Sequence, residues 1–184
     1  MLYSIIYLIY CNNLAKAQDY YIQLINCTDY LIKEEKSIGD QEQAKILYQA
    51  SIFALKFNDA WKNTAFCTSA SMAAAKLATL SSLSQNDRAD AARKSALHGN
   101  QNAGFLYAQF LEKGDGVLKD FISAYAWYND VASYAAGARS QEAKAAMQRL
   151  ETLLPIQSQL EAQARSRKIA EERKSRQGCR FFLE

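Results

Sequence analysis

The sequence predicts an all-α fold, an α-α superhelix in which antiparallel helix pairs form a short solenoid. One proline and seven glycines occur in 184 residues, and this composition favours long helices with short connections. Apolar residues recur at spacings of three and four along most of the chain, which is typical of helices with one buried face. Gly99 and Gly137 are 38 positions apart (137 minus 99), a spacing typical of helix-pair repeats of roughly 34 to 45 residues.

Residues 1–17 are expected to be a secretory signal peptide. Residues 1–10 form an almost unbroken apolar run, which is too short to cross a bilayer because a spanning helix needs about 20 residues. Ala15-Lys16-Ala17 follows with the small-x-small form of a cleavage site. The sequence therefore favours a periplasmic or secreted protein that is not an integral membrane protein. No Lys or Arg precedes the apolar run, so the alternative is a cytoplasmic protein with a buried first helix.

Four cysteines are present, and in an oxidising compartment two of them can pair. Cys27 and Cys67 are the preferred disulfide, because both are expected on N-terminal helices, whereas Cys179 follows a charged segment. The alternative is that the cysteines are small buried hydrophobic residues on apolar helix faces. The chain contains no C-x-x-C spacing and no His cluster, so the cysteines do not indicate a metal site.

Residues 18–87 are expected to form N-terminal helices, which could be degenerate repeats. Apolar periodicity and capping residues place these helices at about 19–38, 40–58 and 60–80. The third segment is rich in small residues, which lets a neighbouring helix approach closely.

Residues 88–154 show the clearest repetition. A short helix is expected up to Gly99, a second up to the Gly114-Asp115-Gly116 turn, a third up to Gly137, and a fourth over 140–154. Pro155 marks the start of a last helix, because proline is tolerated in the first turn and disfavoured further inside. Residues 155–184 are therefore expected to be a charged C-terminal helix and tail.

Ten positions in this region carry a family pattern. They are Ala103, Tyr107, Gly114, Gly116, Val117, Asp120, Ala124, Trp127, Tyr128 and Gly137. Residues 103–137 resemble a Sel-one-like repeat, a short relative of the tetratricopeptide repeat, whose unit has a G-x-G-V-x-x-D turn and an A-x-x-W-Y-x-x-A-A-x-x-G second helix. The chain departs from that pattern at Phe105-Leu106, where Leu-Gly is usual, at Leu118, where Pro is frequent, and at Val131-Ala132.

The resemblance implies a non-catalytic protein-interaction module, an adaptor or scaffold that holds a protein or peptide on its helical surface, in a bacterium that exports it. With so few repeat units, an uncapped end could also self-associate into a homo-oligomer.

Physical reasons support several of the matched positions. Gly114 and Gly116 can adopt positive φ in a tight corner. Asp120 can accept hydrogen bonds from the first turn of the next helix. Ala124 allows close helix approach, and Trp127 or Tyr128 is expected to fill the groove between successive units.

Residues that would indicate catalysis or a ligand loop are few. The single histidine is His98, and the sequence contains no G-x-S-x-G motif that would supply the nucleophile of a catalytic triad. We expect His98 at a surface or at a helix end. Val117 and Leu118 are apolar, which disfavours a phosphate or calcium loop at Gly114–Gly116. No metal-ligand cluster, nucleotide fingerprint or cofactor motif is present, so neither an enzyme nor a cofactor is expected.

The C-terminal segment supports an alternative function, the binding of nucleic acid or an anionic membrane surface. Its basic residues are Arg165, Arg167, Lys168, Arg173, Lys174, Arg176 and Arg180. Nucleic-acid binding is not favoured, because the net charge is only +3 and the aromatic residues that could stack on bases come after the charges. The simpler interpretation is an exposed terminal helix that solubilises the open end of the stack.

Overall fold

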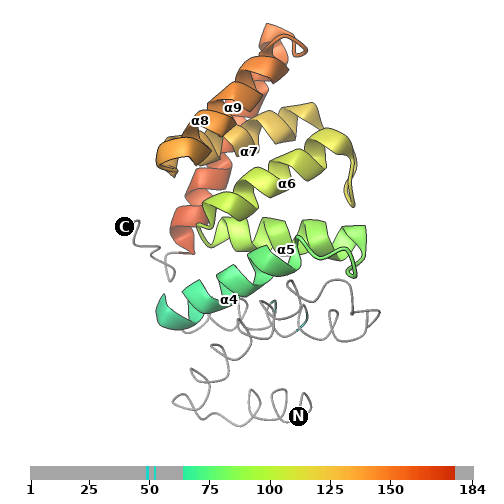
Figure 1. Cartoon of the computed structure of the whole chain (residues 1–184). Coiled ribbons are helices and arrows are strands. Elements are labelled where there is room, and N and C mark those ends of the chain that lie inside the picture. The colour runs from blue at the N-terminus through green and yellow to red at the C-terminus, as the bar shows by residue number, and fades with distance from the viewer. Residues whose placement is uncertain (1–48, 50–51, 53–63, 177–184) are drawn as a thin grey trace, which may run out of the picture.

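The computed structural model describes residues 49, 52 and 64–176, and for 64–70 the backbone alone. These residues form six helices and no strand (Figure 1): α4 (Thr64–Leu77), α5 (Gln85–Leu97), α6 (Gln101–Lys113), α7 (Phe121–Tyr134), α8 (Gly137–Glu151) and α9 (Ile156–Ser175). The predicted all-α fold is confirmed. The expected signal peptide and Cys27 lie outside the described residues, as does the side chain of Cys67 in α4.

Short polar side chains begin the central helices. The Ser84 hydroxyl accepts a hydrogen bond from the Asp87 backbone N–H (3.1 Å) ahead of α5. The Asn100 side chain accepts from two backbone N–H groups of the first turn of α6. Such caps satisfy donors that have no partner within the helix. Gly114 ends α6 in the left-handed region at φ 79°, so the helix stops there without the strain that a Cβ would bring.

Consecutive helices from α4 to α8 pack against one another along the stack (Figure 1). Their interfaces are lined mainly by small side chains; the buried core includes Ala78, Ala89, Ala91, Ala92, Ala96, Ala103, Ala108, Ala124, Ala126, Ala143, Ala146 and Ala162. Between α4 and α5, the hydroxyls of Ser71 and Ser95 each donate to the other residue's backbone carbonyl (3.1 and 2.7 Å). The interior is therefore closely packed, and the same core also holds large side chains such as Phe110, Trp127 and Tyr128.

Two glycines lie at close approaches between helices or units. A Cβ on Gly104 of α6 would be 2.8 Å from Cγ2 of Val131 on α7. A Cβ on Gly116, in the turn after α6, would be 2.0 Å from the backbone oxygen of Gln85 at the start of α5. Gly116 also has φ 71°, so its turn needs glycine both for its own backbone conformation and for contact with α5.

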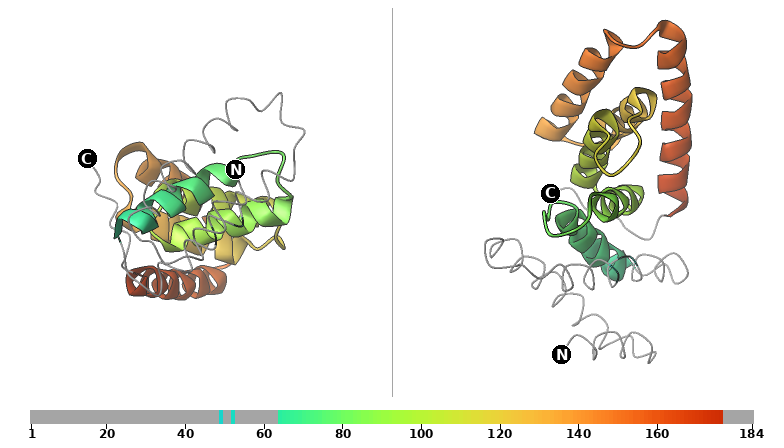
Figure 2. Two further views of the ribbon diagram at one scale, coloured as in Figure 1. Left: turned by 90° about the horizontal axis from the view of Figure 1, so that it is seen from below. Right: turned by 90° about the vertical axis from the view of Figure 1, so that its right-hand side faces the viewer.

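The last two helices do not pack on each other as an antiparallel pair. Helices α8 and α9 diverge from their shared turn and lie on either side of α7 (Figure 2), so each packs on α7 and not along the other. Helix α9 also touches α5. Its first half is bonded to the start of α7 and its second half to Asp130 near the end of α7, so α9 runs parallel to α7.

The expectation of an exposed terminal helix is corrected for α9. Ala162 and Ser166 are buried on its inner face. Arg165 pairs with Asp120 (Nη1 to Oδ2, 2.9 Å), and Arg173 donates to both carboxylate oxygens of Asp130 (3.0 and 3.2 Å). The sequence did not predict this docking, because the arginines were interpreted as one solvent-exposed group. Those on the inner face of α9 form ion pairs with Asp120 and with Asp130 of α7.

Helix α7 ends three residues earlier than expected, at Tyr134. Ala135 and Ala136 are extended, and Gly137, at φ 59°, is the first residue of α8. The Ser140 hydroxyl donates to the Ala132 carbonyl (3.1 Å), which supplies a partner for one of the last carbonyls of α7.

Candidate binding groove

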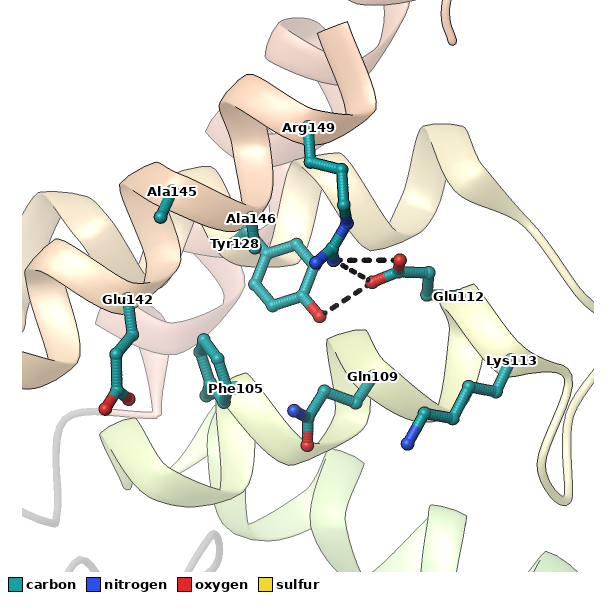
Figure 3. A pocket seen from close by; sticks show the side chains of 9 residues that line it. All are labelled: Phe105, Gln109, Glu112, Lys113, Tyr128, Glu142, Ala145, Ala146 and Arg149. Atoms are coloured by element: carbon teal, nitrogen blue, oxygen red, sulfur yellow. Dashed lines mark hydrogen bonds and ion pairs between the residues drawn. The ribbon is translucent and has the colours of Figure 1, made fainter. Parts of the chain in front are cut away.

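A hollow of about 490 Å³ lies between α6 and α8, with α7 beneath it. Each flanking helix contributes side chains at spacings of three and four, so one continuous stripe of each faces the hollow. The lining residues are Phe105, Gln109, Glu112 and Lys113 of α6, Tyr128 of α7, and Glu142, Ala145, Ala146 and Arg149 of α8. We call this hollow the α6–α8 groove (Figure 3).

The floor of the groove is apolar and closely packed. Tyr128 is buried, and its ring meets Phe105 edge to face with 5.2 Å between centroids. Ala145 and Ala146 leave room above it, because neither side chain extends beyond Cβ. The floor can therefore accept an apolar side chain from a ligand.

A network of polar groups closes one end of the groove. Arg149 donates through Nη2 to both oxygens of Glu112 (2.8 Å each), and the Tyr128 hydroxyl donates to Oε2 of Glu112 (3.1 Å; Figure 3). Burial, followed by the nearby Glu112 carboxylate, raises the pKa of Tyr128. The Tyr128 hydroxyl therefore stays protonated as a hydrogen-bond donor.

At the other end, Arg139 of α8 ties the two helices together. Its guanidinium lies 4.6 Å from the Phe105 ring centroid, and its Nε donates to Oδ1 of Asn102 (3.0 Å). It also pairs with Glu142. At both ends of the groove, an arginine of α8 therefore bonds to a residue of α6. These contacts connect the two helices that form the walls.

No family model matches the sequence, and no curated protein matches it. Among solved structures, the fold is similar to that of c5321, a protective antigen of uropathogenic Escherichia coli strains that displays an SLR fold, with a TM-score of 0.54 at 15% identity. The similarity covers 94% of this chain and 38% of that one. The chain has the Sel-one-like repeat (SLR) fold. The resemblance seen in residues 103–137 is thereby confirmed at the level of fold.

Most of the predicted repeat positions lie in the core or in the turn after α6, and Tyr128 also lines the groove. Ala103 and Ala124 are buried, and Val117 packs partly buried against the core. Trp127 and Tyr128 were the two residues expected to fill the groove between successive units. Tyr128 lies between α6 and α8, at the floor of the α6–α8 groove. Trp127 instead packs on Tyr107 inside its own helix pair, with centroids 5.1 Å apart and ring planes at 87°.

Asp120, at the end of the turn, joins α7 to α9. Its Oδ1 accepts from the Ser123 backbone N–H (2.9 Å), and its Oδ2 accepts from the Ser123 hydroxyl and from Arg165 of α9. Partial burial raises the pKa of Asp120, but these hydrogen bonds together outweigh it, so the pKa lies below its ordinary value. The residue caps α7 and anchors α9 at the same time.

His98 was expected at a surface or at a helix end. It lies at the C-terminal cap of α5, and its side chain is buried. In the part of the SLR chain that the structure describes, no group of three or more His, Cys, Asp and Glu side chains could hold a metal ion. Within the same residues, no helix is both long enough and apolar enough to cross a bilayer.

Sequence reasoning missed most of the groove of this SLR unit. Gln109, Glu112 and Arg149 were not singled out, because family positions are mainly those that pack or turn. On α6, Gln109 is followed by polar residues three and four positions later, and on α8 Glu142 and Arg149 are seven positions apart. Each set shares one helix face, and this was the available signal. Asp130 was also missed, although it is the one charged residue of α7 and is buried.

Proposed function

We propose that this chain is a non-catalytic protein-interaction module of SLR type, which binds an extended segment of a partner protein in the α6–α8 groove. The observation that carries the proposal is the groove itself, with an apolar floor at Tyr128 and Phe105 and a fixed polar rim. Such a combination of apolar area and a few oriented polar groups is what recognition sites use.

We also propose a domain division, export and a disulfide that involve residues outside those that the structure describes. The proposed division is into a signal peptide (1–17), N-terminal helices (18–87), a repeat region (88–154) and a C-terminal segment (155–184). Export is by a bacterium, and the proposed disulfide is Cys27–Cys67. The neighbour of the same fold is a protective antigen of a bacterium, which is compatible with export. Mass spectrometry of the exported protein tests it, since a mature chain beginning at Gln18 is expected.

A blocked groove tests the binding proposal. Ala145 is exposed on α8 and lines the groove, whereas Gln163 is exposed on α9 away from it. Ala145→Arg fills the groove, and Gln163→Arg adds the same side chain elsewhere. Proteins captured by the unaltered chain should be lost from Ala145→Arg and kept by Gln163→Arg. Equal capture by both variants would place the binding surface elsewhere.

The alternative, a basic helix for nucleic acid or an anionic membrane, has less support. Two arginines of α9 and the arginine at its C-cap are engaged by carboxylates: Arg165 by Asp120 and Glu161, Arg173 by Asp130, and Arg176 by Glu172. The exposed cations Arg167, Lys168 and Lys174 share their surface with Glu171. Fluorescence anisotropy with a duplex DNA decides the point: tight binding that weakens steeply with salt would favour the alternative.

A further inference from the structure

The charges around the α6–α8 groove are not equally available. Glu112 is engaged by Arg149 and Tyr128, and Glu142 is paired with Arg139. Both carboxylates of the groove are thus already neutralised by arginines. A ligand with a positive charge would have to compete with these arginines for them.

Donors, in contrast, remain available. Lys113 is exposed in the last turn of α6, and within the described residues its ammonium group has no ion pair. The Gln109 amide has no hydrogen bond within the same part of the chain. Arg149 uses only Nη2 on Glu112, and its side chain is 58% exposed. Three groups of the groove therefore have N–H bonds left for a ligand, and among them Lys113 is the one whose charge no described carboxylate neutralises.

The donors have a set distance from the apolar floor. Along α6, Lys113 lies about 6 Å beyond Gln109 and about 12 Å beyond Phe105, at a rise of about 1.5 Å per residue. Tyr128, whose hydroxyl reaches Glu112, lies between these ends. Alternate side chains of an extended peptide point to the same side and are about 7 Å apart. A peptide with its apolar side chain over Tyr128 therefore brings the side chain two positions away to Lys113.

We propose that the groove selects a peptide segment in which an aspartate or glutamate lies two positions from an apolar residue, with the carboxylate paired to Lys113. Gln109 then binds the peptide backbone, and Arg149 supplies a second donor to the carboxylate or to a nearby carbonyl. This inference rests on the proposed function, because it specifies the ligand of the same groove.

A symmetric pair of peptides tests the inference without knowledge of the natural partner. The first is acetyl-Ala-Leu-Ala-Asp-Ala-Leu-Ala-amide, in which leucines flank the acid by two positions on both sides, so that either chain direction fits. The second has Asn in place of Asp. Both are titrated into the ¹⁵N-labelled full chain, and amide shifts of α6 and α8 are followed. The Asp peptide is expected to shift these amides, and the Asn peptide to bind about fivefold more weakly, the scale of one exposed ion pair.

The variant Lys113→Met separates the two proposals. This variant keeps the aliphatic stem, lies on an exposed turn, and is expected to bind the Asp and Asn peptides equally. A preference for Asp that persists in it would overturn the pairing with Lys113. Equal binding of both peptides to the unaltered groove would overturn the acidic preference but leave the groove as a peptide site. Shifts confined to other helices, or none with either peptide, would overturn the groove proposal itself, and this inference with it.

Discussion

Arg173 of α9 lies between two residues of α7, donating to both oxygens of Asp130 while its guanidinium is 3.9 Å from the Tyr134 ring centroid. Asp130 is 1% exposed and Arg173 16% exposed at their side chains. Burial raises the pKa of Asp130, and Arg173 offsets this in part. The charge pair thus joins the C-terminal helix to the centre of the repeat.

Arg173→Ala is expected to destabilise the chain by about 3 to 5 kcal/mol, because it leaves the Asp130 carboxylate buried without a partner. Urea unfolding at pH 7 measures the effect. Arg167→Ala is the matched control, since Arg167 is exposed on the same helix, and a change within about 0.5 kcal/mol is expected there. The double variant Asp130→Ala/Arg173→Ala should lose less than the sum of its single variants, and full additivity would contradict the pairing.

Acidification should weaken the Asp120 anchor. The pKa of Asp120 in the folded chain lies below its ordinary value of 3.8, so its contribution to stability is present above about pH 4 and is lost as the pH falls through the lowered folded value. The stability difference between the unaltered chain and Asp120→Asn should therefore shrink as the pH drops below 3.8. Asp130, whose folded pKa is raised, should act in the opposite sense, favouring the folded state more at low pH. A difference for Asp120→Asn that is constant between pH 2.5 and 7 would contradict the assignment.

Gly116→Ala should be among the most damaging single-methyl additions. It combines a residue at φ 71° with a Cβ 2.0 Å from the Gln85 carbonyl oxygen, and we expect a loss of about 3 kcal/mol or more in the free energy of unfolding. Gly137→Ala is the control, because Gly137 also has positive φ but its Cβ would meet nothing within 4 Å. It should cost only about 1 to 2 kcal/mol. Similar losses for the two variants would contradict a steric role for Gly116.

Trp127→Ala should cost about 3 to 5 kcal/mol, because Trp127 is 6% exposed and packs edge to face on Tyr107. Thermal melting reports the loss. Leu118→Ala should leave the midpoint nearly unchanged, since Leu118 is 91% exposed. An unchanged midpoint for Trp127→Ala would contradict its place in the core.

The sequence was most informative where residue type alone determines geometry. Helix periodicity, Pro155 and the glycines at 99 and 114 predicted the order of α4 to α9, because backbone rules act locally. The divergence of α8 and α9 could not be foreseen, since it depends on where Arg165 and Arg173 find their aspartates. The α6–α8 groove was missed because it also depends on contacts between residues far apart in the sequence. Its wall residues are ordinary polar positions on two separate helices, and only the packing on α7 brings them together.

Site-specific photocross-linking tests the central claim most directly. A photoreactive benzoylphenylalanine replaces Gln109 in the groove in one variant and Gln163 on the outer face of α9 in another, and both are irradiated in the chain's native compartment. The groove position is expected to cross-link a partner protein, and the α9 position is not. Equal cross-linking from Gln163, or none from Gln109 while the partner is still captured, would contradict the assignment of the α6–α8 groove as the binding surface.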